Sequence, residues 1–332
     1  MGNISSDWRA RARHRDAGRV SVPLLDRQLL FVTGKGGVGK TSIAAAVARL
    51  AAAEGRRTLV CEMDAKGALA AALGAADVGY EPVEVAPNLF AMSMHTEDSL
   101  REYLRVIARI PIVGRLGPLA RTFDFVADAA PGVKEILAVG KLCYEVRERH
   151  YDLVVVDAEA SGHVVAQLDA PRVIRDLVRV GVIRDQTQWM LDILGDPRRT
   201  GLVAVATPEE MPVAETLELI ARVRSVTEVD VAAVVVNRMP SPWFAPADAD
   251  VLDHLVGRRA LAAVASAADT DESAAGAVLA AARSVAARRA AAIGHLDQLR
   301  AGFARTAPMI ILPEVHGAVV EELRGSLGAE LL

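Results

Sequence analysis

The stretch "LLFVTGKGGVGKTS" (residues 29–42) joins an apolar run to a glycine-rich turn, after which an alanine-rich helical pattern begins. Gly34, Gly39, Lys40 and Thr41 satisfy the pattern G-x-x-x-x-G-K-[ST] of a phosphate-binding loop. The pattern follows a predicted strand and opens a predicted helix, which is the setting that its mechanism needs. The backbone N–H groups of such a loop bind phosphate oxygens, and the helix N-terminus adds positive potential. Residues 34–42 are therefore predicted to bind phosphate groups.

The same loop predicts ATP and Mg²⁺ as the bound nucleotide and cation. Lys40 is expected to reach the β- and γ-phosphates, and the Thr41 hydroxyl is expected to ligate Mg²⁺. The residues predicted to contact the nucleotide are Gly34, Gly36, Gly37, Val38, Gly39, Lys40, Thr41 and Ser42.

The composition predicts an α/β fold. Hydrophobic residues make up 52% of the 332 residues but aromatic residues only 4%, so Ala, Val, Leu and Ile must build the core. Several apolar runs are continuous blocks, as parallel strands covered on both faces require. We predict a P-loop NTPase fold with a doubly wound, mainly parallel sheet and helical insertions. Its strands are expected at 29–33, 57–64, 88–94, 151–158, 201–207, 229–239 and 308–313.

The chain reads as one domain with a basic tail. Residues 1–27 are rich in arginine and are predicted to be a disordered tail, and residues 28–330 to form a single P-loop ATPase domain. Helical inserts are expected at about 96–150 and 171–196, and one long Ala/Arg helix near the C-terminus.

Both inserts contain many apolar side chains, for which two interpretations stay open: a groove for a client, or plain core. They are Leu100, Leu104, Ile107, Ile110, Ile112, Val113, Leu116, Phe123 and Phe125 in the first, and Leu177, Val180, Ile183, Trp189, Met190, Ile193 and Leu194 in the second.

Charge, hydropathy and cysteine spacing exclude several classes of protein. The net charge of −4 is too small for a global nucleic-acid binder, and no nucleic-acid partner is expected. No run of 18 uncharged apolar residues occurs, so a cytoplasmic location is predicted, with peripheral attachment to a membrane left open. Cys61 and Cys143 are isolated in sequence, and no zinc site is predicted.

Two carboxylates end predicted strands. Asp64 closes the strand at 57–64 and Asp157 the strand at 151–158, at the sheet edge where ligands of such folds collect. One could orient or deprotonate the attacking water while the other holds Mg²⁺ through its waters. Asp64 and Asp157 are therefore predicted to be catalytic, with Asp157 and Thr41 at the metal.

The second lysine of the loop distinguishes a subclass. Lys35, directly after the first glycine in "GKGGVGKT", resembles the deviant Walker A subclass of P-loop ATPases. The resemblance implies a dimer in which this lysine reaches the nucleotide of the partner subunit. A cation supplied in this way would neutralise charge on the transferred phosphoryl group. The partner is expected to be an identical subunit or a paralogue.

Further motifs sharpen the resemblance to the ArsA-like ATPases over about residues 29–325. Asp64 matches the switch I Asp of that family, and Asp157, Gly162 and His163 match its switch II pattern D-x-x-x-x-G-H. The segment 196–220 is similar to the family's P-E and E-T segment, here Pro208, Glu209, Glu215 and Thr216. Asn237 and Pro313 lie where the family reads adenine. His163 is either a γ-phosphate sensor or a structural histidine.

The resemblance implies a dimeric, Mg²⁺-dependent ATPase whose opening and closing is coupled to a client or membrane partner. One alternative is the energising subunit of an anion or arsenite efflux pump, and another is a partitioning-type positioning ATPase. The residues after Asp64 and Asp157, "AKGALA" and "AEASGH", depart from the forms in the pump and the targeting ATPase of this family. The specific role of the chain is therefore left open.

Overall fold

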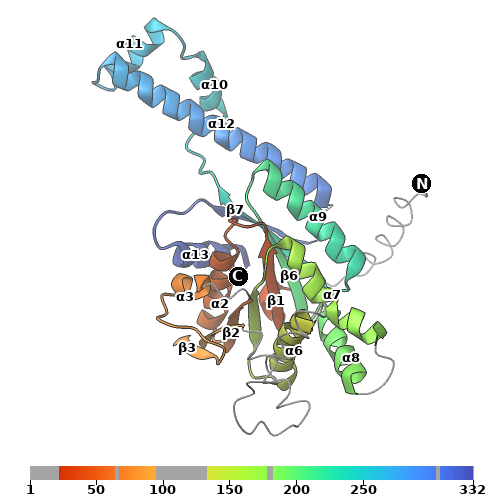
Figure 1. Ribbon diagram of the computed structural model, residues 1–332. Coiled ribbons are helices and arrows are strands. Elements are labelled where there is room, and N and C mark those ends of the chain that lie inside the picture. Colours follow the sequence, from red (N-terminus) through yellow and green to blue (C-terminus); the bar gives the residue numbers. More distant parts are fainter. Residues whose placement is uncertain (1–21, 64–66, 95–132, 178–181, 304–306, 332) are drawn as a thin grey trace, which may run out of the picture.

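The computed structural model describes residues 22–63, 67–94, 133–177, 182–303 and 307–331. Over these residues the chain forms a sheet flanked by helices (Figure 1). The sheet has eight strands in the order β3-β4-β2-β5-β1-β6-β7-β8. The strands are β1 Leu29–Gly34, β2 Thr58–Glu62, β3 Val83–Ala86, β4 Leu89–Ser93, β5 Leu153–Asp157, β6 Thr200–Ala206, β7 Val231–Met239 and β8 Met309–Pro313.

The sheet is parallel except at one edge. All pairs from β4 to β8 are parallel, whereas β3 pairs with β4 in antiparallel fashion. The seven strands predicted from sequence are all present, which confirms the α/β prediction. The strand β3, "VEVA", is an addition, and its two leading residues are exposed because it lies at the edge.

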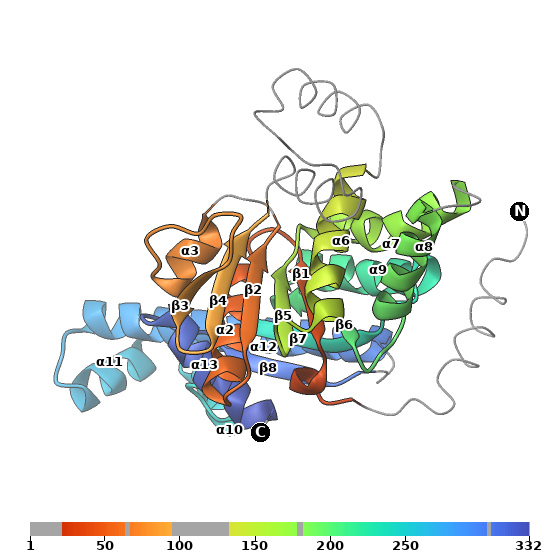
Figure 2. The ribbon, with the colours of Figure 1, turned by 90° about the horizontal axis from the view of Figure 1, so that it is seen from below.

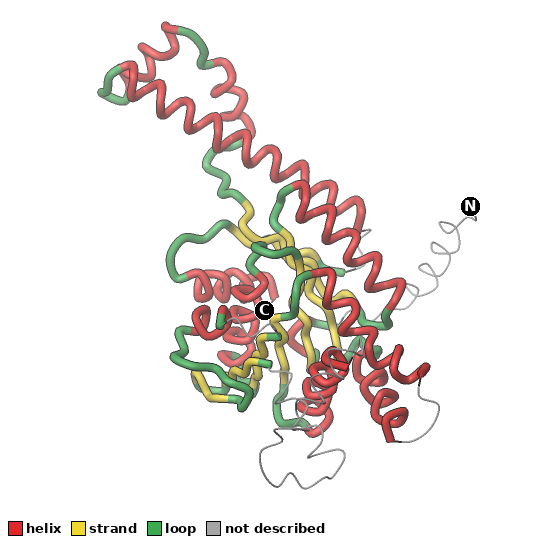
Figure 3. The backbone as a smooth tube through the Cα atoms, viewed as in Figure 1, coloured by secondary structure: helices red, strands yellow, loops and turns green. Residues whose placement is uncertain are grey.

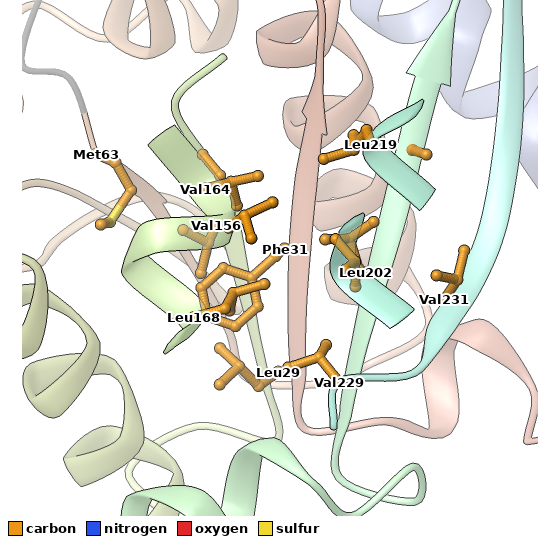
Figure 4. Close-up of a cluster of buried hydrophobic side chains, with 14 of the residues drawn as sticks. Leu29, Phe31, Met63, Val156, Val164, Leu168, Leu202, Leu219, Val229 and Val231 are labelled. Atoms are coloured by element: carbon orange, nitrogen blue, oxygen red, sulfur yellow. The ribbon is translucent and has the colours of Figure 1, made fainter. Parts of the chain in front are cut away.

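Alternate residues of the central strands enter two separate hydrophobic cores. In β1, Leu29 and Phe31 face one core while Leu30 and Val32 face the other, and all four are fully buried. Figure 4 shows Phe31 beside Leu168 of the first core. This double burial explains the continuous apolar runs, because a strand covered on both faces has no solvent side.

Helices cover each face of the sheet. The helices α2 Lys40–Ala53, α3 Ala68–Leu73 and α13 Val319–Leu331 enclose one core. The other core is enclosed by α6 Val133–Glu148, α7 Ser161–Leu177, α8 Val182–Leu194 and α9 Glu210–Val226. Figure 2 shows α6 to α9 gathered beside β5, β1 and β6.

A helical arm projects from the body between β7 and β8. It consists of α10 Pro246–His254, α11 Arg258–Ala267 and the first half of α12 Glu272–Phe303 (Figures 1 and 3). The second half of α12 packs on the body, where Leu296, Leu299 and Phe303 belong to the core. The single long helix was predicted, but α10 and α11 were not.

The structure describes only part of the two expected helical inserts. Residues 95–132, most of the first insert, lie outside the described residues, and its end forms α6. The prediction of an insert beginning at 171 needs correction, because α7 already begins at Ser161 and contains Pro171. In α8, Met190, Ile193 and Leu194 are buried in the core, so they do not line a groove.

The body also includes residues before the expected boundary at 28. Leu24 and Leu25, in the short 3₁₀ helix Leu24–Asp26, are buried in the core around α2. The Arg27 side chain is 4% exposed and pairs with Asp230 at 2.8 Å. The structure therefore places the end of the predicted tail against the body. None of the helices described is both long and apolar enough to cross a membrane.

Candidate nucleotide site

The glycine-rich loop lies between β1 and α2, at the carboxyl edge of the sheet. Gly34 has to be glycine because a Cβ atom there would lie 2.1 Å from the Val205 carbonyl oxygen of β6. Gly39 precedes α2 with φ of 95°, in the left-handed region that favours glycine. A Cβ on Gly36 or Gly37 would meet no atom within 4 Å. The loop therefore forms an open cradle in front of the N-terminus of α2, where an anion binds favourably.

Thr41 and Asp157, the two residues expected at the metal, meet beside this cradle. The Thr41 hydroxyl donates to Asp157 Oδ2 at 2.6 Å, bringing the first turn of α2 to the end of β5. A hydroxyl and a carboxylate offer the oxygen ligands that Mg²⁺ requires, the carboxylate most often through water. The donor set thus fits a magnesium ion.

Both loop lysines lie at the cradle. Lys40 Nζ is 3.4 Å from the backbone oxygen of Lys35, so the side chain folds back over the loop. Lys35 Nζ lies 2.6 Å from Glu215 Oε1 of α9 in the same chain. Sequence analysis identified Glu215 as a motif residue but gave it no partner.

Asn237 lies beneath the loop, near the end of β7. Its side-chain Nδ2 donates to the Val38 carbonyl at 2.9 Å, and its Oδ1 accepts from the Arg238 backbone N–H at 3.0 Å. A Cβ on Gly39 would lie 2.5 Å from Asn237 Nδ2. Asn237 therefore positions the phosphate loop, a contact that the predicted adenine-reading role did not include.

A cavity of about 230 Å³ lies beside Asn237 and Gly39. Its walls come from the start of α2, the end of β7 and the segment after β8, and a planar base held there would adjoin the loop. Pro313 itself does not line the cavity. The residues that follow it, from Glu314 on, do. The lining residues are Gly39, Ser42, Asn237, Arg238, Glu314, Val315, His316, Val319 and Leu323.

Asp64 lies outside the described residues, but its flanks are described. Glu62, at the end of β2, accepts from the backbone N–H groups of Gly67 at 3.2 Å and Ala68 at 2.9 Å. Glu62 thereby fixes the chain on both sides of residues 64–66 at the start of α3. Sequence analysis missed this buried carboxylate.

The segment after Asp157 is held by Glu159. Its backbone oxygen accepts from the Thr33 hydroxyl at 2.8 Å, and its Oε1 accepts from Gln167 Nε2 of α7 at 2.9 Å. His163 Nδ1 lies 3.7 Å from Glu159 Oε2, and the histidine side chain is 76% exposed. His163 is therefore not a buried structural histidine. The glutamate is one of the departures from the family pattern noted in the sequence.

No cluster of three metal-ligating side chains occurs among the described residues. Cys61 and Cys143 are free and fully buried in the core beside α6. Burial raises the pKa of both thiols, that of Cys143 to about 12.

The strand, glycine loop and helix, with Thr41 against the aspartate that ends β5, define a P-loop nucleotide-binding protein. A family model described as anion-transporting ATPase matches residues 27–187 and 177–245. The chain belongs to this ArsA-type ATPase family.

Three relatives illustrate the range of the family. ATPase BagA of Mycobacterium tuberculosis is 30% identical over 67% of this chain and 68% of its own length. An ATPase of Halobacterium salinarum, named for driving an arsenical pump, is 26% identical over 65% of this chain and 36% of its own. ATPase GET3 of Podospora anserina is 25% identical over 66% of this chain and 76% of its own.

Proposed function

We propose that the protein is a Mg²⁺-dependent ATP hydrolase that works as a dimer, with an identical subunit or a paralogue as its partner. The observation that carries this proposal is the Thr41–Asp157 contact of 2.6 Å beside the open glycine cradle. Family membership supports ATP as the nucleotide.

Each residue of the cradle has a role in this proposal. The backbone N–H groups from Gly36 to Thr41 and the Lys40 ammonium bind and orient the phosphates. Thr41 and Asp157 would hold Mg²⁺, which when bound neutralises charge on the β- and γ-phosphates. Asp64 orients the attacking water and accepts its proton, and Lys35 of the partner subunit stabilises the charge that develops on the transferred group.

The first experiment is calorimetric titration of ATP in the presence of Mg²⁺. Lys40→Ala is expected to lose nucleotide binding, because the phosphates lose their main cation. Arg258→Ala, at an exposed position of α11, is the control and should bind as the wild type does. Equal ATP affinity in wild type and Lys40→Ala would refute the site.

The second experiment separates binding from turnover. Asp64→Asn should bind ATP and dimerise but hydrolyse slowly, since an amide is a poor base of nearly the same shape. Lys35→Ala should bind ATP but lose turnover and ATP-dependent dimerisation. Hydrolysis at the wild-type rate by Lys35→Ala would show that the intersubunit role is wrong.

We further propose that ATP-driven closure is coupled to a client or membrane partner. The names of the relatives support such a coupling in the family, since one is named for driving an arsenical pump. Because Met190, Ile193 and Leu194 of α8 are buried in the core, these three residues do not belong to the proposed client surface. Purification with ATP trapped on Asp64→Asn, followed by mass spectrometry of co-eluting proteins, tests the coupling. Recovery of the same proteins with ADP-bound protein would contradict it.

The Halobacterium relative also favours a second candidate, the energising subunit of an anion pump. That function predicts that arsenite or antimonite stimulates ATP hydrolysis. A hydrolysis rate that does not respond to either anion would remove this candidate.

A further inference from the structure

Lys35, the second lysine of the phosphate loop, forms an ion pair within its own chain. Lys35 Nζ lies 2.6 Å from Glu215 Oε1, and the two side chains are 34% and 31% exposed. The pair joins the glycine loop to α9 across 180 residues of sequence. In this arrangement the Lys35 ammonium faces α9 of its own subunit.

We propose that Glu215 is a positioning residue that holds Lys35 inside its own subunit and releases it when two ATP-bound subunits associate. The inference rests on the proposed function, in which Lys35 acts on the partner's nucleotide. On release, Lys35 leaves the Glu215 carboxylate of its own chain and contacts phosphate oxygens of the nucleotide bound to the other subunit. Glu215 thereby raises the ATP requirement for dimer formation.

Glu215 suits this role because the surrounding backbone of α9 is packed and cannot move together with Lys35. The neighbouring Thr216 is 1% exposed and Leu219 is 2% exposed, so this turn of α9 is packed into the body. In the same turn, Leu217 packs against Gly302 of α12, where an added Cβ would lie 2.8 Å from the Leu217 side chain. Release therefore has to come from movement of the Lys35 side chain or its loop.

The strength of the pair suits a contact that is broken in every cycle. A partly exposed ion pair shifts an equilibrium by about 1.4- to 5-fold. A lysine–phosphate contact in a closed interface is charge-assisted and excludes water, so it can displace the carboxylate. Because both subunits of a homodimer release their lysine, the effect on the dimerisation constant is squared, to about 2- to 25-fold.

The test is Glu215→Gln, which keeps the shape of the side chain and removes its charge. With Mg²⁺ and a non-hydrolysable ATP analogue, sedimentation should show dimerisation strengthened by about 2- to 25-fold. Glu218→Gln, at an exposed position of the same helix, is the matched control and should equal the wild type. Unchanged or weaker dimerisation of Glu215→Gln would overturn the inference.

Two further measurements separate this inference from the proposed function. In a Lys35→Ala background, Glu215→Gln should change nothing, because Glu215 acts only through Lys35. If Lys35→Ala dimerises like the wild type, the proposed intersubunit role fails. If Lys35→Ala does not dimerise and Glu215→Gln equals the wild type, only the inference fails.

A nucleotide-free assay is independent of the oligomer. An amine-reactive reagent, which attacks the side chain after its proton has passed to water, should label Lys35 about 1.4- to 5-fold faster in Glu215→Gln than in the wild type, because a larger fraction of Lys35 is outside the ion pair. Equal labelling rates of Lys35 in the two proteins would contradict the pair in solution.

Discussion

Substitution of Asn237 tests whether this residue positions the phosphate loop or serves only to recognise the base. In the structure its Nδ2 donates to the carbonyl of Val38 at 2.9 Å. Asn237 is 4% exposed and Val38 is 2% exposed, so this hydrogen bond is shielded from solvent in the folded protein. A buried carbonyl left without its partner costs about 1–3 kcal/mol. The Arg238 N–H belongs to an exposed residue and can bond to water.

We therefore expect Asn237→Ala to lower the free energy of unfolding by about 1–3 kcal/mol without nucleotide. Asn237→Asp should lower it further at neutral pH, because a buried carboxylate then faces the Val38 carbonyl. Urea unfolding followed by circular dichroism measures both values, with Ser273→Ala at an exposed position of α12 as the control.

The same variants should lose ATP affinity, since the loop that binds phosphate is no longer held at Val38. Addition of ATP should recover only part of the lost stability, because ligand stabilisation falls with affinity. If Asn237→Ala unfolds at the wild-type urea concentration, the hydrogen bond to Val38 does not hold the loop and the reasoning is refuted.

The remaining predictions concern the metal, the buried ion pair and the thiols. Asp157→Asn should make ATP affinity insensitive to removal of Mg²⁺ by a chelator, and calorimetry that still shows a magnesium effect would contradict its role. Arg27→Ala removes the guanidinium that pairs with buried Asp230, and we expect a loss of about 3–5 kcal/mol in urea unfolding; a loss under 1 kcal/mol would count against the pair. Burial raises the pKa of the Cys61 and Cys143 thiols, so both stay protonated at pH 8 and should react with a thiol reagent only after unfolding.

The sheet could be predicted largely because its strands are buried on both faces. A run such as "LVVVD" at β5 is recognisable without knowledge of its neighbours. The short edge strand β3, with two exposed residues of four, has no comparable pattern. The helices α10 and α11 were not predicted because Leu252 and Ala265 are the only buried residues among the positions whose exposure is described, so no apolar stripe marks either helix.

At the site, residues within the loop could be predicted, and contacts between distant segments could not. The spacing of Gly34, Gly39 and Lys40 is local and has a known mechanism. The partners of Asn237 and Lys35 lie 199 and 180 residues away, and no periodicity or spacing indicates such pairs. The roles of Asp64 and Lys35 stay predictions.

The division of α12 between body and arm makes this helix a lever. Its 32 residues span about 48 Å at 1.5 Å per residue, with Phe303 anchored in the core and Glu272 at the far end. The part from Glu272 to Ala292, the first residue of α12 in the core around α6 to α9, spans about 30 Å, so a tilt of about 10° there would move the far end by roughly 5 Å. At the anchored end, Gly302 packs against Leu217 of α9, which lies in the same helical turn as Glu215. A small change of angle at the edge of the core would therefore move the tip of the arm by several ångströms.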